Sequence, residues 1–155
     1  PQHPNDEYRS CLLNHFRFIH DIPKVKLFSL QKDKRLRRYK FSKTPIDLME
    51  GSEGLKIIDI TDNIEPFEDT AAAIKSLDLL ITVDTSILHL AGALNVPTWG
   101  LIPYNNDWRW KVEECNTEWY SSVRLFRQKV LGEWNYVFNE VLETLKKEKP
   151  CLWKI

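Results

Sequence analysis

The stretch 79–99, LLITVDTSILHLAGALNVPTW, constrains the fold most, because it predicts a strand, a sharp turn, a helix and the start of another strand. Residues 79–83 are apolar and rich in β-branched side chains, as is typical of a strand buried on both faces. Asp84, Thr85 and Ser86 follow, and all three residue types are favoured helix N-caps. This pattern is half of a βαβ unit with polar groups at the carboxyl end of its first strand, the edge at which open α/β sheets bind ligands.

The rest of the chain alternates between strands and helices in the same way. We expect strands near residues 25–30, 57–60, 79–83, 98–101 and 123–126, and helices near 10–20, 31–40, 70–77, 86–95 and 134–147. Alternation of this kind predicts one Rossmann-like α/β domain over residues 1–155, a parallel sheet with helices on both faces. Such a domain normally begins with a strand, whereas this chain begins with a loop. We therefore expect the first strand to lie upstream in a longer protein.

Charge and cysteine content exclude several classes of protein. The chain has 22 basic and 22 acidic residues, which argues against a general nucleic-acid binder, and the basic run 32–40 is interpreted as a solvated helix face. Cys11, Cys115 and Cys151 lie far apart without a CxxC spacing, so they indicate neither a zinc site nor a disulfide framework. No apolar run approaches the roughly 20 residues of a membrane span. We expect a cytoplasmic protein that uses no cofactor.

The segment 78–110, DLLITVDTSILHLAGALNVPTWGLIPYNNDWRW, resembles the C-terminal, nucleotide-sugar-binding half of GT-B glycosyltransferases. It is most similar to the heptosyltransferase-like family (glycosyltransferase family 9) and its relatives attached to tetratricopeptide repeats. The likeness continues through residues 119–134 and the opening loop 3–10, HPNDEYRS, so it spans nearly the whole chain. The resemblance implies transfer of a sugar from a nucleotide-diphosphate sugar to an acceptor hydroxyl, without a bound metal. The facing N-terminal half would supply the acceptor site and the catalytic base, so this chain alone would bind the donor weakly or not at all, and it would not turn over.

The turn after the strand 79–83 carries four candidate substrate-binding residues. Free N–H groups at a helix start suit a diphosphate, and Thr85 and Ser86 add hydroxyl donors, although the family often has glycine or alanine at position 86. Asp84 repels phosphate, so it orders the turn or accepts from a sugar or ribose hydroxyl. His89 shares a helix face with Thr85 and could donate to a phosphate. The alternatives are an ordinary N-cap for the turn and a core histidine for His89.

The opening loop carries three further candidates, His3, Asn5 and Arg9, which the resemblance places on the other side of the phosphates. Arg9 is the best of them for pairing with phosphate charge. The alternative for the loop is a solvated terminus.

Two aromatic segments complete the predicted site. The resemblance places the base and ribose near Phe67, for which the alternative is helix capping by Asp69 plus one core aromatic. In the DWRW motif, residues 107–110, Arg109 is expected to meet a phosphate or to pair with Asp107, and the tryptophans are expected to pack the loop onto the domain.

Two other functions stay open: a non-catalytic GT-B-like interaction module, and half of a sugar-nucleotide epimerase. The upstream sequence would discriminate between the transferase and the module. A second Rossmann-like half or helical repeats there would favour the transferase, and the absence of both would favour the module. The expected partners are a nucleotide-diphosphate sugar and the missing half of the same protein, and no catalytic residue is expected in this chain. An absent first strand would also leave an unpaired sheet neighbour and favour self-association, which light scattering would detect.

Overall fold

The computed structural model describes residues 6–31, 54–61, 64, 66–112 and 114–152. The chain divides into two compact units, one of residues 12–70 and a larger one of residues 1–11 and 71–155. The described strands form two parallel sheets, one in each unit, and helices accompany them. This arrangement confirms the predicted α/β, Rossmann-like class. The expectation of one domain over residues 1–155 stays a prediction.

The smaller unit contains a two-stranded sheet in which β1 (Leu27–Ser29) runs parallel to β2 (Ile57–Asp59). The helix expected over residues 10–20 is confirmed only over residues 13–20. That region contains the 3₁₀ helix η1 (Leu13–Phe16) and the short α2 (Arg17–His20), and α1 (Asp6–Arg9) precedes them. Leu12 separates α1 from η1 because its backbone is extended, with φ −75° and ψ 147°. The basic run 32–40 lies outside the described residues.

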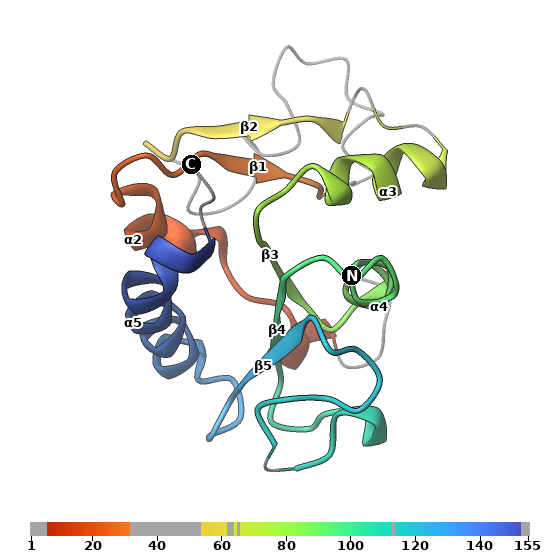
Figure 1. Ribbon diagram of the computed structural model, residues 1–155. Helices are drawn as coiled ribbons and strands as arrows, with labels where there is room; N and C mark the ends of the chain where they lie inside the picture. Colours follow the sequence, from red (N-terminus) through yellow and green to blue (C-terminus); the bar gives the residue numbers. More distant parts are fainter. Residues whose placement is uncertain (1–5, 32–53, 62–63, 65, 113, 153–155) are drawn as a thin grey trace. The chain divides into compact units, whose positions relative to one another are not determined.

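The larger unit contains a three-stranded parallel sheet in the order β3 (Leu80–Val83), β4 (Thr98–Ile102) and β5 (Val123–Arg127) (Figure 1). The central strand β4 is buried along its whole length. Burial on both faces explains why residues 98–102 contain almost no polar side chain.

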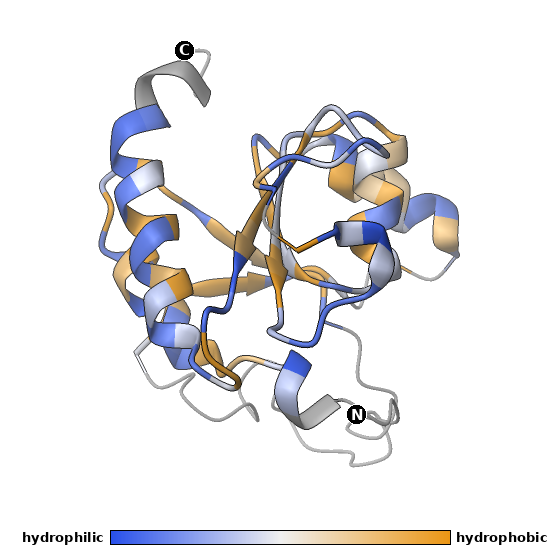
Figure 2. Ribbon diagram, turned by 90° about the horizontal axis from the view of Figure 1, so that it is seen from below, coloured by the Kyte–Doolittle hydropathy of each residue, from blue (hydrophilic) through white to orange (hydrophobic). Residues whose placement is uncertain are grey.

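Two helices cover opposite faces of this sheet, α4 (Ser86–Ala93) and α5 (Trp134–Leu152) (Figures 1 and 2). Successive side chains along a strand point to opposite faces of the sheet, so the contacts of single residues show which helix covers which face. A Cβ atom added to Gly100 would lie 2.7 Å from Leu88 on α4. On the next strand, Arg124 pairs with Glu148 of α5 at 2.5 Å. The apolar stripe expected for this helix was Val137, Val141, Leu142 and Leu145; three of these are buried, Leu142 is half-buried, and Phe138 is buried beside them.

The ends of α4 set the geometry of the site. Its N-cap is Thr85, immediately after the turn that leaves β3. At its other end, Asn95 adopts a left-handed backbone with φ 55°, which asparagine tolerates better than most residues. The amides of Asn95 and Val96 donate to the carbonyls of Gly92 and Ala91, so a Schellman motif ends the helix.

The helix expected to start after an Asp69 cap begins earlier. It is α3 (Phe67–Lys75), and Glu68 and Asp69 lie inside its first turn. Carboxylates in the first turn of a helix interact favourably with the positive end of the helix dipole.

None of the helices in the described residues has both the length and the apolar character that a membrane span requires.

Candidate functional site

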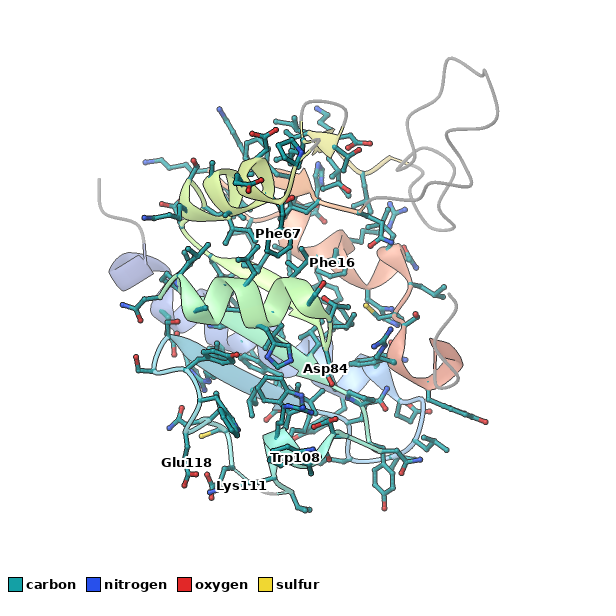
Figure 3. The ribbon with its side chains drawn as sticks, turned by 90° about the vertical axis from the view of Figure 1, so that its right-hand side faces the viewer. Phe16, Phe67, Asp84, Trp108, Lys111 and Glu118 are labelled. Carbon is teal, nitrogen blue, oxygen red and sulfur yellow. The ribbon has the colours of Figure 1, made fainter. Side chains whose placement is uncertain are left out.

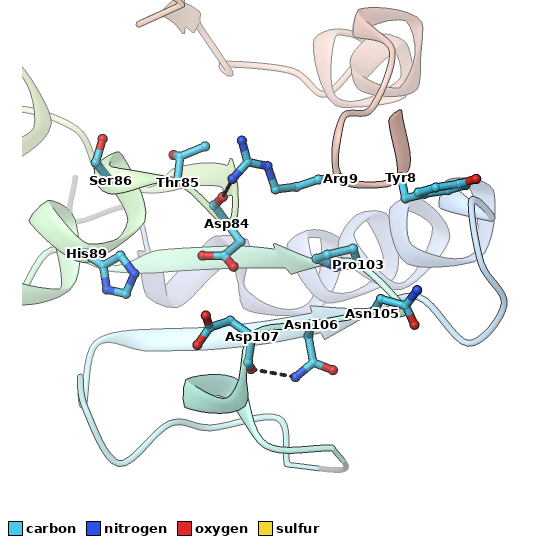
Figure 4. Close-up of a pocket in the computed structure, with 10 residues that line it drawn as sticks. All are labelled: Tyr8, Arg9, Asp84, Thr85, Ser86, His89, Pro103, Asn105, Asn106 and Asp107. Atoms are coloured by element: carbon cyan, nitrogen blue, oxygen red, sulfur yellow. Dashed lines mark hydrogen bonds between the residues drawn. The ribbon is translucent and has the colours of Figure 1, made fainter. Parts of the chain in front are cut away.

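A pocket of about 470 Å³ opens at the carboxyl ends of β3 and β4 (Figure 4). Asp84 follows β3 directly and Pro103 follows β4 directly, so the pocket occupies the sheet edge that the sequence indicated. Five predicted residues line it together with five others: Tyr8, Arg9, Asp84, Thr85, Ser86, His89, Pro103, Asn105, Asn106 and Asp107.

The start of α4 forms one side of this pocket. Thr85 has the extended backbone of an N-cap, with φ −143° and ψ 173°, but its side chain makes no capping hydrogen bond. Its Oγ1 lies instead 3.5 Å from Oγ1 of Thr82. The first amides of α4 therefore have no side-chain acceptor from the N-cap residue, although the sequence offered three favoured cap residues here. Amides in this state, at the positive end of a helix, are suited to an anion.

Arg9 lies at the edge of the same pocket. Its Nη1 donates to the backbone carbonyl of Asp84 at 3.1 Å, which links α1 to the turn between β3 and α4 across 75 positions of sequence. This bond fixes the guanidinium beside the helix start (Figure 4). The predicted juxtaposition of Arg9 with the turn is thus present in the structure.

His89 lies on α4 and combines the two alternatives that its sequence position left open. It lines the pocket, and its ring also stacks on the buried Trp110, with centroids 5.2 Å apart and planes inclined by 25°. Its Nδ1 lies 3.0 Å from the hydroxyl of Tyr120. His89 is therefore both packed and accessible from the pocket.

The side of the pocket opposite α4 presents acceptors. Asp107 Oδ1 accepts from the backbone N–H of Arg109 at 3.0 Å and from its guanidinium at 2.7 Å. These bonds, with the backbone N–H contributing most, lower the pKa of Asp107 from its usual value of 3.8. The nearby His89 contributes to the same shift. Asn106 donates to the carbonyls of Asp107 and Lys111. Asp107 is thus an ionised acceptor at neutral pH.

We predict that the Asp107 bond to the Arg109 amide survives until the pH falls below 3.8. A carboxyl with a lowered folded-state pKa contributes stability above its unfolded pKa and loses it as the pH falls through the folded value. The ¹H–¹⁵N shift of the Arg109 amide should therefore titrate with a midpoint below 3.8, and Asp107→Asn should abolish that step. A midpoint at or above 3.8 would contradict the bonding described for Asp107.

The remaining predicted residues are not brought to this pocket. His3 and Asn5 lie outside the described residues. Phe67 belongs to the smaller unit, where its side chain is 58% exposed, and it does not line the pocket. Arg109 pairs with Asp107 and lies over the ring of Trp108 at 4.7 Å, which is one of its two predicted alternatives.

The tryptophans of the DWRW motif divide between two environments. Trp110 is 1% exposed and packs in the core beneath α4, which confirms the packing prediction for this residue. Trp108 is 69% exposed, so the prediction is wrong for it. Its ring meets Trp119 edge to face at 6.0 Å on the loop after β4, where Lys111 also pairs with Glu118 (Figure 3).

The sequence did not predict that Asn105, Asn106 and Asp107 line the pocket, or that Tyr120 is the hydrogen-bond partner of His89. Asn105, Asn106 and Asp107 follow β4 just as Asp84 follows β3, so the same edge argument could have found them. Tyr120 gave no comparable local signal, because it meets His89 across 31 positions of sequence. Within the described part of the chain, no three His, Cys, Asp or Glu side chains lie close enough to hold a metal ion.

No protein-family model, curated protein or solved structure matches this chain.

Proposed function

We propose that this chain is the nucleotide-diphosphate-sugar binding part of a GT-B glycosyltransferase of the heptosyltransferase-like kind. The observation that supports it is one pocket with hydrogen-bond donors along one side and acceptors along the other. A nucleotide-diphosphate sugar has the complementary character, since its diphosphate is anionic and its sugar and ribose carry neutral hydroxyl groups.

The donor side suits the diphosphate. It combines the amides at the start of α4 with the hydroxyls of Thr85 and Ser86 and the guanidinium of Arg9. Charge-assisted bonds to arginine and to helix N-termini are the strongest that phosphate oxygens form with proteins.

The acceptor side suits hydroxyl groups. The carboxylates of Asp84 and Asp107 both line the pocket, and each would repel a phosphate placed against it. A hydroxyl can instead donate to either carboxylate. The two sides together therefore give the ligand a direction, with its phosphates toward the start of α4 and a sugar or ribose toward Asp107.

In this proposal the chain binds the donor and stabilises the departing group. When the bond between sugar and diphosphate breaks, negative charge develops on the nucleoside diphosphate. Preorganised donors such as the α4 amides and Arg9 stabilise that charge more than they stabilise the bound donor. The acceptor site and the catalytic base would come from a facing half of the same protein.

The cellular setting is part of the same proposal. Cys11 and Cys115 are free thiols, as a reducing compartment favours. We accordingly propose a cytoplasmic protein whose partners are the donor and the facing half.

Calorimetric titration of the 155-residue chain with inorganic pyrophosphate and with uridine diphosphate tests the proposal. We expect both to bind with a Kd of about 1 mM, because one wall of the site is present. Arg9→Gln should weaken binding about tenfold, since it removes a charge-assisted bond.

The matched control is Arg17→Gln. Arg17 is an exposed arginine of the smaller unit that donates to Asn14 and does not line the pocket, so this change removes the same charge from a different site. It should leave both affinities unchanged. Equal losses for the two variants would indicate a net-charge effect, and absence of binding by the unaltered chain at about 10 mM ligand would contradict the proposal.

A further inference from the structure

We propose that Tyr120 is a positioning residue for His89. Its hydroxyl donates to Nδ1 of the imidazole and thereby holds the tautomer in which Nε2 carries the proton and serves the pocket. This inference rests on the proposed function in one respect, the anionic ligand to which Nε2–H would donate. The tautomer itself can be measured with no ligand present.

The hydrogen bond determines which ring nitrogen is left for the pocket. Nδ1 of His89 lies 3.0 Å from the hydroxyl oxygen of Tyr120. No other described residue is bonded to the imidazole, and His89 lines the pocket, so Nε2 is the ring nitrogen available to a ligand there (Figure 4).

Gly92 makes this bond possible. It lies three residues after His89 and therefore on the same face of α4. A Cβ atom at position 92 would lie 2.4 Å from Cγ of Tyr120 and within 2.8 Å of two more ring atoms. The tyrosine ring thus lies directly against the helix backbone, and only glycine leaves room for it. Because the ring lies this close to the helix, the hydroxyl of Tyr120 reaches the imidazole of His89.

Aromatic neighbours hold the imidazole in place from two directions. Trp110 stacks on it at 5.2 Å, and the ring of Tyr120 meets it edge to face at 5.8 Å. Trp110 is itself buried, so it cannot withdraw without disturbing the core. With the ring orientation fixed by packing, the position of the proton is the remaining variable, and Tyr120 controls it.

The surrounding charges favour the proton on Nε2. The pocket contains the carboxylates of Asp84 and Asp107, and His89 is close enough to Asp107 to affect its ionisation. If Nδ1 carried the proton and donated to Tyr120, the lone pair of Nε2 would face these carboxylates and any bound phosphate. A tyrosine hydroxyl that donates to Nδ1 avoids this repulsion and leaves a donor facing the pocket.

The test uses Tyr120→Phe, which retains the ring against Gly92 and removes only the hydroxyl. Long-range ¹H–¹⁵N spectra of histidine-labelled protein, recorded at a pH at which His89 is neutral, report the tautomer directly. We expect His89 of the unaltered chain to be in the Nε2–H form and Tyr120→Phe to give a mixture. We also expect the Kd for inorganic pyrophosphate to rise about three- to tenfold.

Two further variants separate positioning from general damage. Tyr136→Phe removes a tyrosine hydroxyl that contacts Lys129 on the exposed side of α5, so it should change neither the tautomer nor the affinity. His89→Gln keeps an N–H donor near the position of Nε2 and needs no tautomer. In that background Tyr120→Phe should no longer weaken pyrophosphate binding.

The outcomes separate this inference from the proposed function. A wild-type tautomer in Tyr120→Phe, or an Nδ1–H form in the unaltered chain, would overturn the role of Tyr120. Failure of the unaltered chain to bind pyrophosphate would contradict the proposed function, while the tautomer spectra would still decide the role of Tyr120. A loss of affinity of the same size in the His89 and His89→Gln backgrounds would show that Tyr120 acts independently of the imidazole.

Discussion

Gly92→Ala is expected to lower the free energy of unfolding by about 2–3 kcal/mol. In the interior of an exposed helix the same change stabilises by about 0.5–1 kcal/mol, because glycine loses more backbone freedom on folding. Here the new methyl group would lie 2.4–2.8 Å from three ring atoms of Tyr120, far inside van der Waals contact. The ring cannot move away without losing its bond to His89. Urea denaturation followed by circular dichroism measures the effect.

The matched experiment repeats Gly92→Ala in a Tyr120→Ala background. With the tyrosine ring absent, the steric clash disappears and the ordinary helix preference for alanine should make the same substitution neutral or stabilising. This reversal of sign is specific to the contact between the two residues. An equal loss of stability in both backgrounds would show that Gly92 is required for another reason.

Arg127→Lys is expected to cost about 2 kcal/mol of stability although it conserves the charge. The Arg127 guanidinium donates through Nε to the carbonyl of Glu114 at 2.9 Å and through Nη1 to that of Lys111 at 3.1 Å. Its Nη2 donates to the carbonyl of Trp110. One side chain on β5 thus organises the loop that follows Asp107. An ammonium group cannot reach three separate carbonyls at once, so at least one would lose its donor.

Arg124→Lys is the control, since Arg124 lies on the same strand but makes an ion pair instead of bonds to backbone carbonyls. Its partner is Glu148 at 2.5 Å, and both side chains are about 40% exposed. Pairs of this kind contribute about 0–1 kcal/mol, so the control should change stability little. Similar losses at positions 124 and 127 would argue against a special role for the three carbonyl bonds. Pyrophosphate binding should weaken in Arg127→Lys alone, because only that variant loosens the Asp107 loop.

The fold was predictable where it depends on residues that are close together in the sequence. The strand in the run 79–83 and the polar turn after it depend on near neighbours in sequence, and the structure has both where expected. The helix expected over residues 10–20 was only partly right, because it begins at residue 13. Its apolar spacing suits a helix, but spacing does not report the extended backbone at Leu12 that interrupts it.

The candidate site was predictable only in part, because half of it depends on contacts between distant residues. The turn at Asp84 and the helix start are local, and the resemblance supplied Arg9. The bond between Tyr120 and His89 spans 31 positions, and no spacing rule brings those residues together. Trp108 and Trp110 show the same limit, since one side chain of the motif is mostly exposed and the other is buried.

The most direct test of the donor-site assignment is a titration of ¹⁵N-labelled protein with inorganic pyrophosphate, followed through backbone amide shifts. We predict saturable shifts at the amides of Ser86 and Ile87, the first residues of α4, together with the side chain of Arg9. The amide of Phe28 on β1 should stay unchanged. Saturation that leaves Ser86 and Ile87 unmoved while other amides shift would contradict a diphosphate site at the start of α4.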